Sequence, residues 1–194
     1  VGEPSLRFEE DALRILRSLR FMSRLGFRLD DETAKALRQN AFRLKTISRE
    51  RIFSELSGII CGKNACDTVT EYADVISVAL PELFAGGAFM LKRLPDELHL
   101  RFAALFKNAD DAENGMFSLK SPRKLRERVV ALRRLIPLPD DEKEILILGI
   151  DTPPEILREA AYWNSTGKTA DIIDRLRMQN AFVSSKNLGI PTQK

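Results

Sequence analysis

The sequence has few of the residues that build metal sites or disulfide frameworks. Among its 194 residues are two cysteines, Cys61 and Cys66, and one histidine, His99. A structural zinc ion takes four ligands, so Cys and His side chains cannot form a zinc site here. Two thiols without a secretory context indicate a reducing compartment, and we expect a cytoplasmic protein.

Long apolar runs are absent as well. No stretch reaches about 18 consecutive apolar residues, so no membrane-spanning helix is expected. The first residues lack a basic segment followed by an apolar run, so they do not form a signal peptide. No run of alternating β-branched residues predicts a strand.

The composition is that of a globular protein with a mildly basic surface. Hydrophobic residues make up 44% of the chain, enough to bury a core, and charged residues make up 30%. The net charge is only +3, which permits a polyanionic partner but does not require one. The plain alternative is a solvated surface with extra Lys and Arg.

Helical periodicity with capping residues dominates the chain, which predicts an all-α fold, an elongated assembly of short helices. Gly26 is expected as a left-handed C-cap, and Asp30 or Asp31 and Ser48 as N-caps. Residues 108–114 are acidic and are expected to form a loop. The expected helices lie at about 9–25, 30–39, 48–60, 64–80, 97–107, 122–135, 140–148, 154–163 and 168–180.

The first expected helix carries the most informative motif. On a continuous helix, Asp11 and Arg14 share one face, with Glu10 and Arg17 beside them. A carboxylate accepts hydrogen bonds and a guanidinium donates them, so the pair can imitate a Watson–Crick edge. Asp would accept from the exocyclic amine of cytosine or adenine, and Arg would donate to the ring nitrogen. Uracil and guanine present a donor to Arg and would be rejected.

The alternative for the same residues is an ordinary surface ion pair, which contributes about 0.2–0.5 kcal/mol. The positions of the apolar residues help to decide between base recognition and a surface ion pair. Phe21 and Leu25 fall on the same side as Arg14, whereas other apolar residues fall elsewhere on the helix. A helix that is apolar around much of its girth is expected to be sandwiched, with its charged end facing a cleft.

The run VGEPSLRFEEDALRILRSLRFMSRLGFRLDDET resembles the opening of the neck in class II CCA-adding enzymes and bacterial poly(A) polymerases. It contains the family's E-D-x-x-R signature as Glu10, Asp11 and Arg14. The resemblance implies that Asp11 and Arg14 recognise the base of CTP or ATP, with Glu10 orienting Arg14. Arg17 flanks this set and joins the nucleotide-binding candidates. A second run, ISRERIFSEL, resembles the family's next neck motif and implies a supporting role for Arg51.

The resemblance also implies the rest of the architecture and chemistry. Residues 1–85 would form the neck, 86–136 the body and 137–194 part of the tail. The family transfers CMP and AMP to tRNA with Mg²⁺, which two carboxylates in a D-x-D motif hold on a catalytic head. This sequence has no D-x-D, so we expect the chain alone to be inactive and the head to be its partner.

A second candidate surface follows from charge. One late helix and its approach hold seven basic residues that suit tRNA phosphates, with the equally open alternative of a solvated helix face. The candidate RNA-binding residues are Lys120, Arg123, Lys124, Arg126, Arg128, Arg133 and Arg134. Two other functions also stay open. One is a poly(A) polymerase of the same family, and the other is a non-catalytic helical RNA-binding protein.

Overall fold

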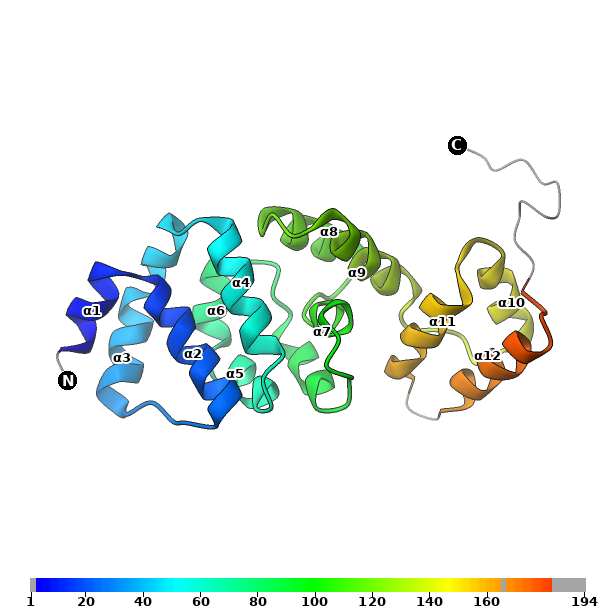
Figure 1. The fold of residues 1–194 in the computed structure, drawn as a ribbon, viewed down its shortest axis with the longest axis horizontal. Helices are drawn as coiled ribbons and strands as arrows, with labels where there is room; N and C mark the ends of the chain where they lie inside the picture. Colours follow the sequence, from blue (N-terminus) through cyan, green and yellow to red (C-terminus); the bar gives the residue numbers. More distant parts are fainter. Residues whose placement is uncertain (1–2, 165–166, 183–194) are drawn as a thin grey trace. The chain divides into compact units, whose positions relative to one another are not determined.

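The computed structural model describes residues 3–164 and 167–182, which form helices and connecting turns without a strand (Figure 1). The all-α prediction is confirmed. The contacts divide the chain into two compact units, Val1–Val130 and Ala131–Lys194. The three-part division into neck, body and tail is a separate, family-based one and stays a prediction. No described helix combines the length and apolar character that crossing a bilayer requires.

The first unit holds the helices that carry the candidate nucleotide site. Its elements are α1 (Pro4–Glu10), α2 (Leu13–Leu25), α3 (Asp31–Asn40), η1 (Ala41–Thr46), α4 (Arg49–Ile60), α5 (Ala65–Glu71), α6 (Ala73–Ala79), η2 (Ala85–Lys92), α7 (Leu98–Ala104) and α8 (Ala109–Ser118). Helix α9 (Arg123–Leu135) begins in this unit and ends in the second. The second unit continues with α10 (Glu142–Asp151), α11 (Pro154–Ala160), η3 (Ala161–Trp163) and α12 (Lys168–Met178).

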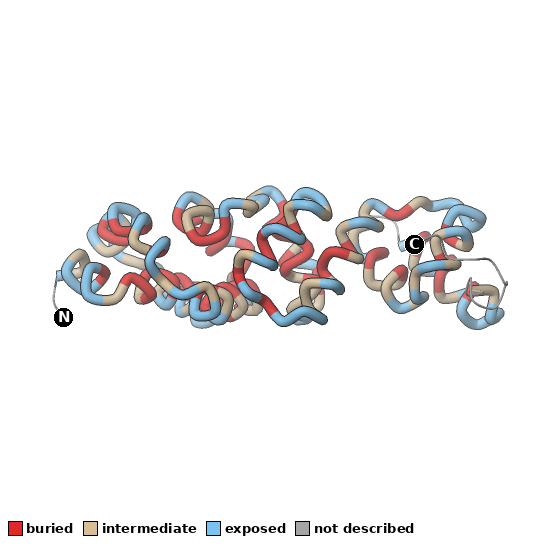
Figure 2. The backbone as a smooth tube through the Cα atoms, turned by 90° about the horizontal axis from the view of Figure 1, so that it is seen from above, coloured by how far each residue is buried: buried red, intermediate tan, exposed pale blue. Residues whose placement is uncertain are grey.

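The packing of α2 against α4 forms the centre of the first unit. Ile15, Leu16 and Leu19 of α2 are fully buried, as are Ile52 and Ile59 of α4. Burying one such side chain stabilises the fold by about 1.5–3 kcal/mol. Buried and exposed stretches alternate along the helices in Figure 2, as expected for helices that each cover one side of a core.

Several helix ends match the sequence-based expectations. Gly26 ends α2 with φ 74°, a left-handed conformation that glycine adopts without steric cost. The Asp30 carboxylate accepts a hydrogen bond of 2.9 Å from the Thr33 amide and caps α3. Ser48 occupies the N-cap of α4, but its hydroxyl makes no capping hydrogen bond.

Three expected segments differ from the structure. The first helix is interrupted at Asp11, and the helix at 64–80 is divided at Tyr72 into α5 and α6. At the second break, Arg38 Nη2 donates a hydrogen bond of 3.1 Å to the carbonyl oxygen of Glu71, the last residue of α5. Most of the acidic loop expected at 108–114 is helical, because residues 109–114 belong to α8. Asn108 caps this helix by accepting from the Asp111 amide at 2.8 Å, and acidic residues in a first turn favour a helix.

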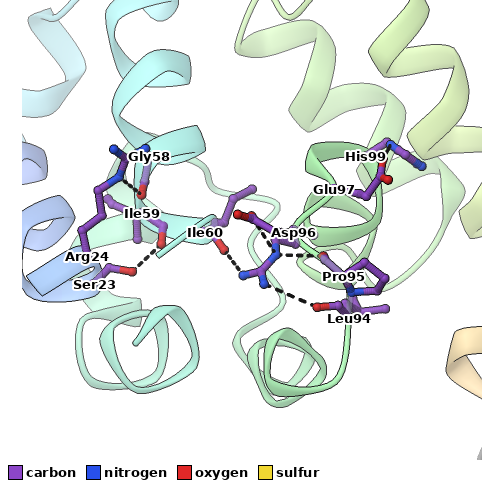
Figure 3. A network of polar contacts seen from close by, with 11 residues as sticks. Ser23, Arg24, Gly58, Ile59, Ile60, Leu94, Pro95, Asp96, Glu97 and His99 are labelled. Atoms are coloured by element: carbon purple, nitrogen blue, oxygen red, sulfur yellow. Dashed lines mark hydrogen bonds and ion pairs between the residues drawn. The ribbon is translucent and has the colours of Figure 1, made fainter. Parts of the chain in front are cut away.

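Side chains from other helices donate hydrogen bonds to the carbonyl oxygens at the C-terminal end of α4 (Figure 3). The carbonyl oxygens of residues 58–60 accept hydrogen bonds from Arg24 Nε, Ser23 Oγ and Arg101 Nη1 at 3.4, 2.5 and 2.6 Å, respectively. The last carbonyls of a helix have no partner within it, so these donors satisfy groups that would otherwise be buried unpaired. Gly62 permits the close approach, since a Cβ there would lie 2.0 Å from Ser23 Oγ.

The second unit has its own small core and its own polar cluster. Leu157, Ile173 and Leu176 are buried in it. The Asp141 carboxylate caps α10 by accepting from the amides of Lys143 and Glu144 at 2.9 and 3.1 Å.

Candidate functional site

Asp11 lies in the break between α1 and α2. Its backbone is extended, with φ −148° and ψ 97°. Its Oδ1 accepts a hydrogen bond of 3.1 Å from the Leu13 amide, so the carboxylate caps the start of α2. The expected single helix over 9–25 is therefore wrong at this residue. Asp competes well for backbone amides, and here capping prevails over helical continuation.

Glu10 lies between two arginines. Its Oε2 is 3.2 Å from Arg14 Nη1 and 3.3 Å from Arg7 Nη1. All three side chains are exposed, so each pair contributes about 0.2–0.5 kcal/mol at most. The arrangement nevertheless restricts where the Arg14 guanidinium can lie, which is what an orienting role for Glu10 requires.

Arg51 approaches Asp11 from α4. Its Nη2 lies 3.7 Å from Asp11 Oδ1, close enough for an ion pair but too long for a hydrogen bond. The side chain of Asp11 is 28% exposed and that of Arg51 is 52% exposed. Both groups therefore retain hydrogen-bonding capacity toward a ligand.

Arg17 forms an ion pair with Glu55 of α4, a residue that the sequence interpretation missed. The Glu55 side chain is buried and lies 3.4 Å from Arg17 Nε and 3.3 Å from Arg20 Nε. These contacts join α2 to α4 and fix the surface on which Arg14 and Arg17 stand. The sequence signal that could have identified Glu55 is its position four residues after Arg51, about one turn along the same helix.

The candidate residues divide between two cavities. A cavity of about 460 Å³ is lined by Glu10, Asp11 and Arg51 together with residues from η1 and the segment after it. Arg14 and Arg17 line a separate cavity of about 570 Å³, beside Phe21 of α2. The residues of the E-D-x-x-R signature are thus close in sequence but face two hollows in this structure.

Two residues of η1 that the sequence analysis did not single out line the first of these cavities. The Phe42 side chain is 60% exposed, and the Arg43 guanidinium lies 5.2 Å from the centre of its ring. Arg43 Nη2 is fixed by Glu9 Oε1 at 3.1 Å. The six-residue 3₁₀ segment is too short to show a periodic apolar pattern, so nothing marked this pair in the sequence.

The seven basic candidates around α9 differ in exposure and pairing. Four of them are exposed, namely Lys120, Arg123, Lys124 and Arg134, whereas Arg126, Arg128 and Arg133 are half-buried. Lys120 Nζ lies 2.9 Å from Glu50 Oε1, Arg123 Nε lies 2.7 Å from Glu127 Oε1, and Arg126 Nε lies 3.3 Å from Glu113 Oε1. Nearby carboxylates therefore neutralise part of the charge that the sequence count suggested.

Magnesium would need a group of carboxylates. Across residues 3–164 and 167–182, no three Asp, Glu, His or Cys side chains lie close enough together to hold a metal ion. The described residues do not fit a Mg²⁺ site, and the cavity beside Asp11 instead offers hydrogen-bonding groups.

Comparison with known proteins places this geometry in a family. A family model described as "Probable RNA and SrmB- binding site of polymerase A" matches residues 26–83. The CCA-adding enzyme of Ligilactobacillus salivarius is 31% identical over 154 residues, covering 74% of this chain and 38% of that enzyme. The CCA-adding enzyme of Limosilactobacillus reuteri is 32% identical over 149 residues, covering 71% of this chain and 36% of that enzyme. The chain thus spans well under half the length of these relatives.

Two solved structures share the fold. The Bacillus stearothermophilus CCA-adding enzyme in complex with CTP aligns with a TM-score of 0.69 at 23% identity, covering all of this chain and 56% of that one. The Thermotoga maritima CCA-adding enzyme complexed with tRNA_CCA aligns with a TM-score of 0.64 at 17% identity, covering 98% and 54%. These matches show that the chain belongs to the family of CCA-adding enzymes and poly(A) polymerases, and that it corresponds to the C-terminal portion of such a protein.

Proposed function

We propose that this chain is the part of a tRNA nucleotidyltransferase that selects the incoming CTP or ATP base and binds tRNA. The observation that carries the proposal is the set of paired acids and arginines at the junction of α1 and α2. Glu10 contacts Arg14, and Asp11 faces Arg51 beside a cavity of about 460 Å³. Relatives named CCA-adding enzymes, one of them in complex with CTP, support the assignment.

Base selection would follow from hydrogen-bond complementarity. Cytosine and adenine both place an exocyclic amine beside a ring nitrogen that accepts. Asp11 accepts from the amine, with Arg51 supporting it in the same cavity. Arg14, which Glu10 holds and which lines the neighbouring cavity, must turn toward Asp11 to donate to the ring nitrogen. Uracil and guanine present an N–H where Arg14 also donates, so two donors would face each other without an acceptor.

The tRNA would be bound through its phosphates. Arg123, Lys124 and Arg134 are exposed on or at the end of α9, where they can contact backbone phosphates without reading sequence. A structure of a relative complexed with tRNA_CCA supports this partner. In the parent enzyme, Mg²⁺ and the catalytic head would complete the site, and the protein would act in the cytoplasm.

The test uses fluorescence anisotropy to measure how tightly the purified chain binds tRNA that lacks its CCA end, at several salt concentrations. We expect binding that weakens as salt rises, because phosphate contacts release counterions. A DNA duplex of equal charge serves as the competitor. Competition by that duplex measures how much of the affinity is for phosphates in general, whereas no tRNA binding at low salt would refute the tRNA assignment.

A poly(A) polymerase is the second candidate, and the family model that matches residues 26–83 favours it by its description. The parent enzyme separates the two functions. Addition of CMP to a tRNA lacking CCA supports the first function, whereas repeated addition of AMP from ATP alone supports the second. A parent without either activity would leave a non-catalytic helical RNA-binding protein.

A further inference from the structure

The cavity beside Asp11 is lined by an aromatic side chain, Phe42, to which the proposed hydrogen bonds with a base edge assign no role. Phe42 stands in η1, whose neighbours Ala41 and Leu44 are buried while the Phe42 ring is 60% exposed. An exposed phenylalanine forgoes much of the stabilisation that burial would give, and a ligand that covers the ring recovers it. The same cavity is lined by Asp11 and Arg51.

The surroundings fix Arg43 in place next to this ring. The Arg43 guanidinium lies 5.2 Å from the ring centre, and Arg43 Nε donates to Asn40 Oδ1 at 3.0 Å. Arg43 Nη2 also donates to Glu9 Oε1 at 3.1 Å. The Asn40 side chain is buried and donates in turn to the Ala36 carbonyl at 2.9 Å. Arg43 is therefore anchored through a buried amide, and less side-chain entropy is lost when a ligand binds.

These features suit a flat, uncharged ring that also carries hydrogen-bonding groups at its edge. A cation–π pair offers a stacking surface, and bases of every kind stack favourably on aromatic rings. Carboxylate and guanidinium groups at the same cavity offer an acceptor and donors. A nucleobase has both the face and the edge that this cavity would contact, whereas an aliphatic ligand has neither.

We propose that Phe42, fixed by Arg43, is the stacking surface for the nucleobase whose edge meets Asp11. The inference rests on the proposed function, because it assumes that Asp11 contacts a base, and it adds an affinity-determining residue outside the E-D-x-x-R signature. Phe42 contributes affinity for any base, and the polar edge groups contribute the choice among bases.

The experiment measures binding of CTP, UTP and ribose 5-triphosphate to the full chain by isothermal titration calorimetry. Phe42→Leu removes the aromatic face but keeps an apolar side chain, and Phe42→Trp enlarges the face. Phe89→Leu is the control, since Phe89 is 66% exposed in η2 and does not line this cavity. Far-ultraviolet circular dichroism and thermal melting verify that each variant is folded.

We expect Phe42→Leu to weaken CTP binding about tenfold, which corresponds to roughly 1.4 kcal/mol. UTP binding should weaken by the same factor, whereas ribose 5-triphosphate binding should not change. Phe42→Trp should bind CTP at least as tightly as the natural chain, and Phe89→Leu should behave like the natural chain.

The outcomes separate this inference from the proposed function. CTP binding that Phe42→Leu leaves unchanged refutes the stacking role while the base-selecting role of Asp11 stands. An equal loss for ribose 5-triphosphate also refutes it, because the effect would then not involve the base. Failure of the natural chain to bind CTP at millimolar concentration would overturn both the stacking role and the proposed base pocket.

Discussion

Arg101 Nη1 donates a hydrogen bond of 2.6 Å to the carbonyl oxygen of Ile60, the last residue of α4. The same guanidinium reaches the Pro95 carbonyl through Nε at 3.0 Å, so one side chain joins α4 to the turn before α7. The Arg101 side chain is only 11% exposed. A positive charge at a helix C-terminus is also favourable toward the helix dipole. Arg101 thereby fixes the end of the helix that carries Arg51 and Glu55.

Arg101→Met should destabilise the first unit, because it leaves buried carbonyl oxygens without donors. Hydrogen bonds from a charged donor contribute about 1.5–3 kcal/mol, so we expect a loss of about 2 kcal/mol. Urea denaturation followed by circular dichroism measures the change. The exposed Arg93 provides a matched control, and Arg93→Met should change the free energy of unfolding by less than about 0.5 kcal/mol. Equal effects of the two variants would show that Arg101 contributes little through these carbonyls.

Asp11→Asn should reduce discrimination between CTP and UTP. Asparagine can still accept from the Leu13 amide and cap α2, so the variant removes the charge and offers a donor to the base edge. Arg14→Ala should have a similar effect by removing donors. A bidentate hydrogen-bonded pair is worth about 1–3 kcal/mol of discrimination by analogy with base readout in DNA. The ratio of CTP to UTP incorporation by the parent enzyme is the measurement.

The control for that pair is Asp31→Asn, an exposed acidic residue of α3. It changes the net charge by the same amount and should leave the ratio unaltered. If Asp11→Asn and Arg14→Ala also left the ratio unaltered, Asp11 would serve only to cap α2 and Arg14 would be a surface group of that helix.

Cys61 should react slowly with alkylating reagents. Burial, together with the nearby Asp96 carboxylate, raises the pKa of the Cys61 thiol to about 11. The thiolate is the reactive form, so at pH 8 only about one thiol in a thousand is reactive, against roughly a quarter for an ordinary cysteine. Iodoacetamide labelling in a Cys66→Ala background should accelerate as pH rises toward 11. Asp96→Asn should speed it, since a negative charge that opposes ionisation is lost, and rates typical of free cysteine at pH 8 would contradict this.

The chain alone should transfer no nucleotide to tRNA. The sequence has no D-x-D motif, and no group of acidic side chains in the described part of the chain could hold a metal ion. CMP incorporation into tRNA lacking its CCA end, with Mg²⁺ present, is the measurement. The parent enzyme is the positive control. Robust turnover by the purified chain would show that metal-binding groups had been missed.

Local signals predicted the class of fold and most helix positions. Gly26 and Asp30 act through their own backbone or the next turn, so their roles could be inferred from short stretches of sequence. Asp11 shows where such inference fails. The i, i+3 spacing to Arg14 favoured a continuous helix, but the carboxylate bonds the Leu13 amide and interrupts it. Capping and continuation differ by about 1 kcal/mol, too little for spacing to decide.

The candidate site depends on contacts between distant segments, which no local pattern reveals. Glu55 reaches Arg17 across 38 residues of sequence, and Arg51 reaches Asp11 across 40. Phe42 lines the cavity because η1 turns toward the start of α2. The family resemblance supplied the residues of the E-D-x-x-R signature, whereas packing between helices determines which cavity each of them faces.

The exposed basic residues of α9 should bind tRNA through its phosphates. Joint substitution Arg123→Gln, Lys124→Gln and Arg134→Gln removes three exposed charges and should weaken binding of every tRNA alike. The plot of log affinity against log salt should flatten by about 0.7–0.9 units for each phosphate that the variant no longer binds. Arg123 already pairs with Glu127, so its own contribution should be the smallest of the three. Choice between CTP and UTP should not change, because it is assigned to Asp11 and Arg14.

The matched control removes the same number of exposed charges elsewhere, through Lys35→Gln, Lys63→Gln and Lys143→Gln. A general electrostatic effect depends on net charge and would weaken tRNA binding equally in both triple variants. A local interface depends on position, so the α9 variant should lose affinity and salt dependence while the control keeps most of both. Equal loss in the two variants would leave α9 as a solvated helix face whose charges act only through the field of the whole protein.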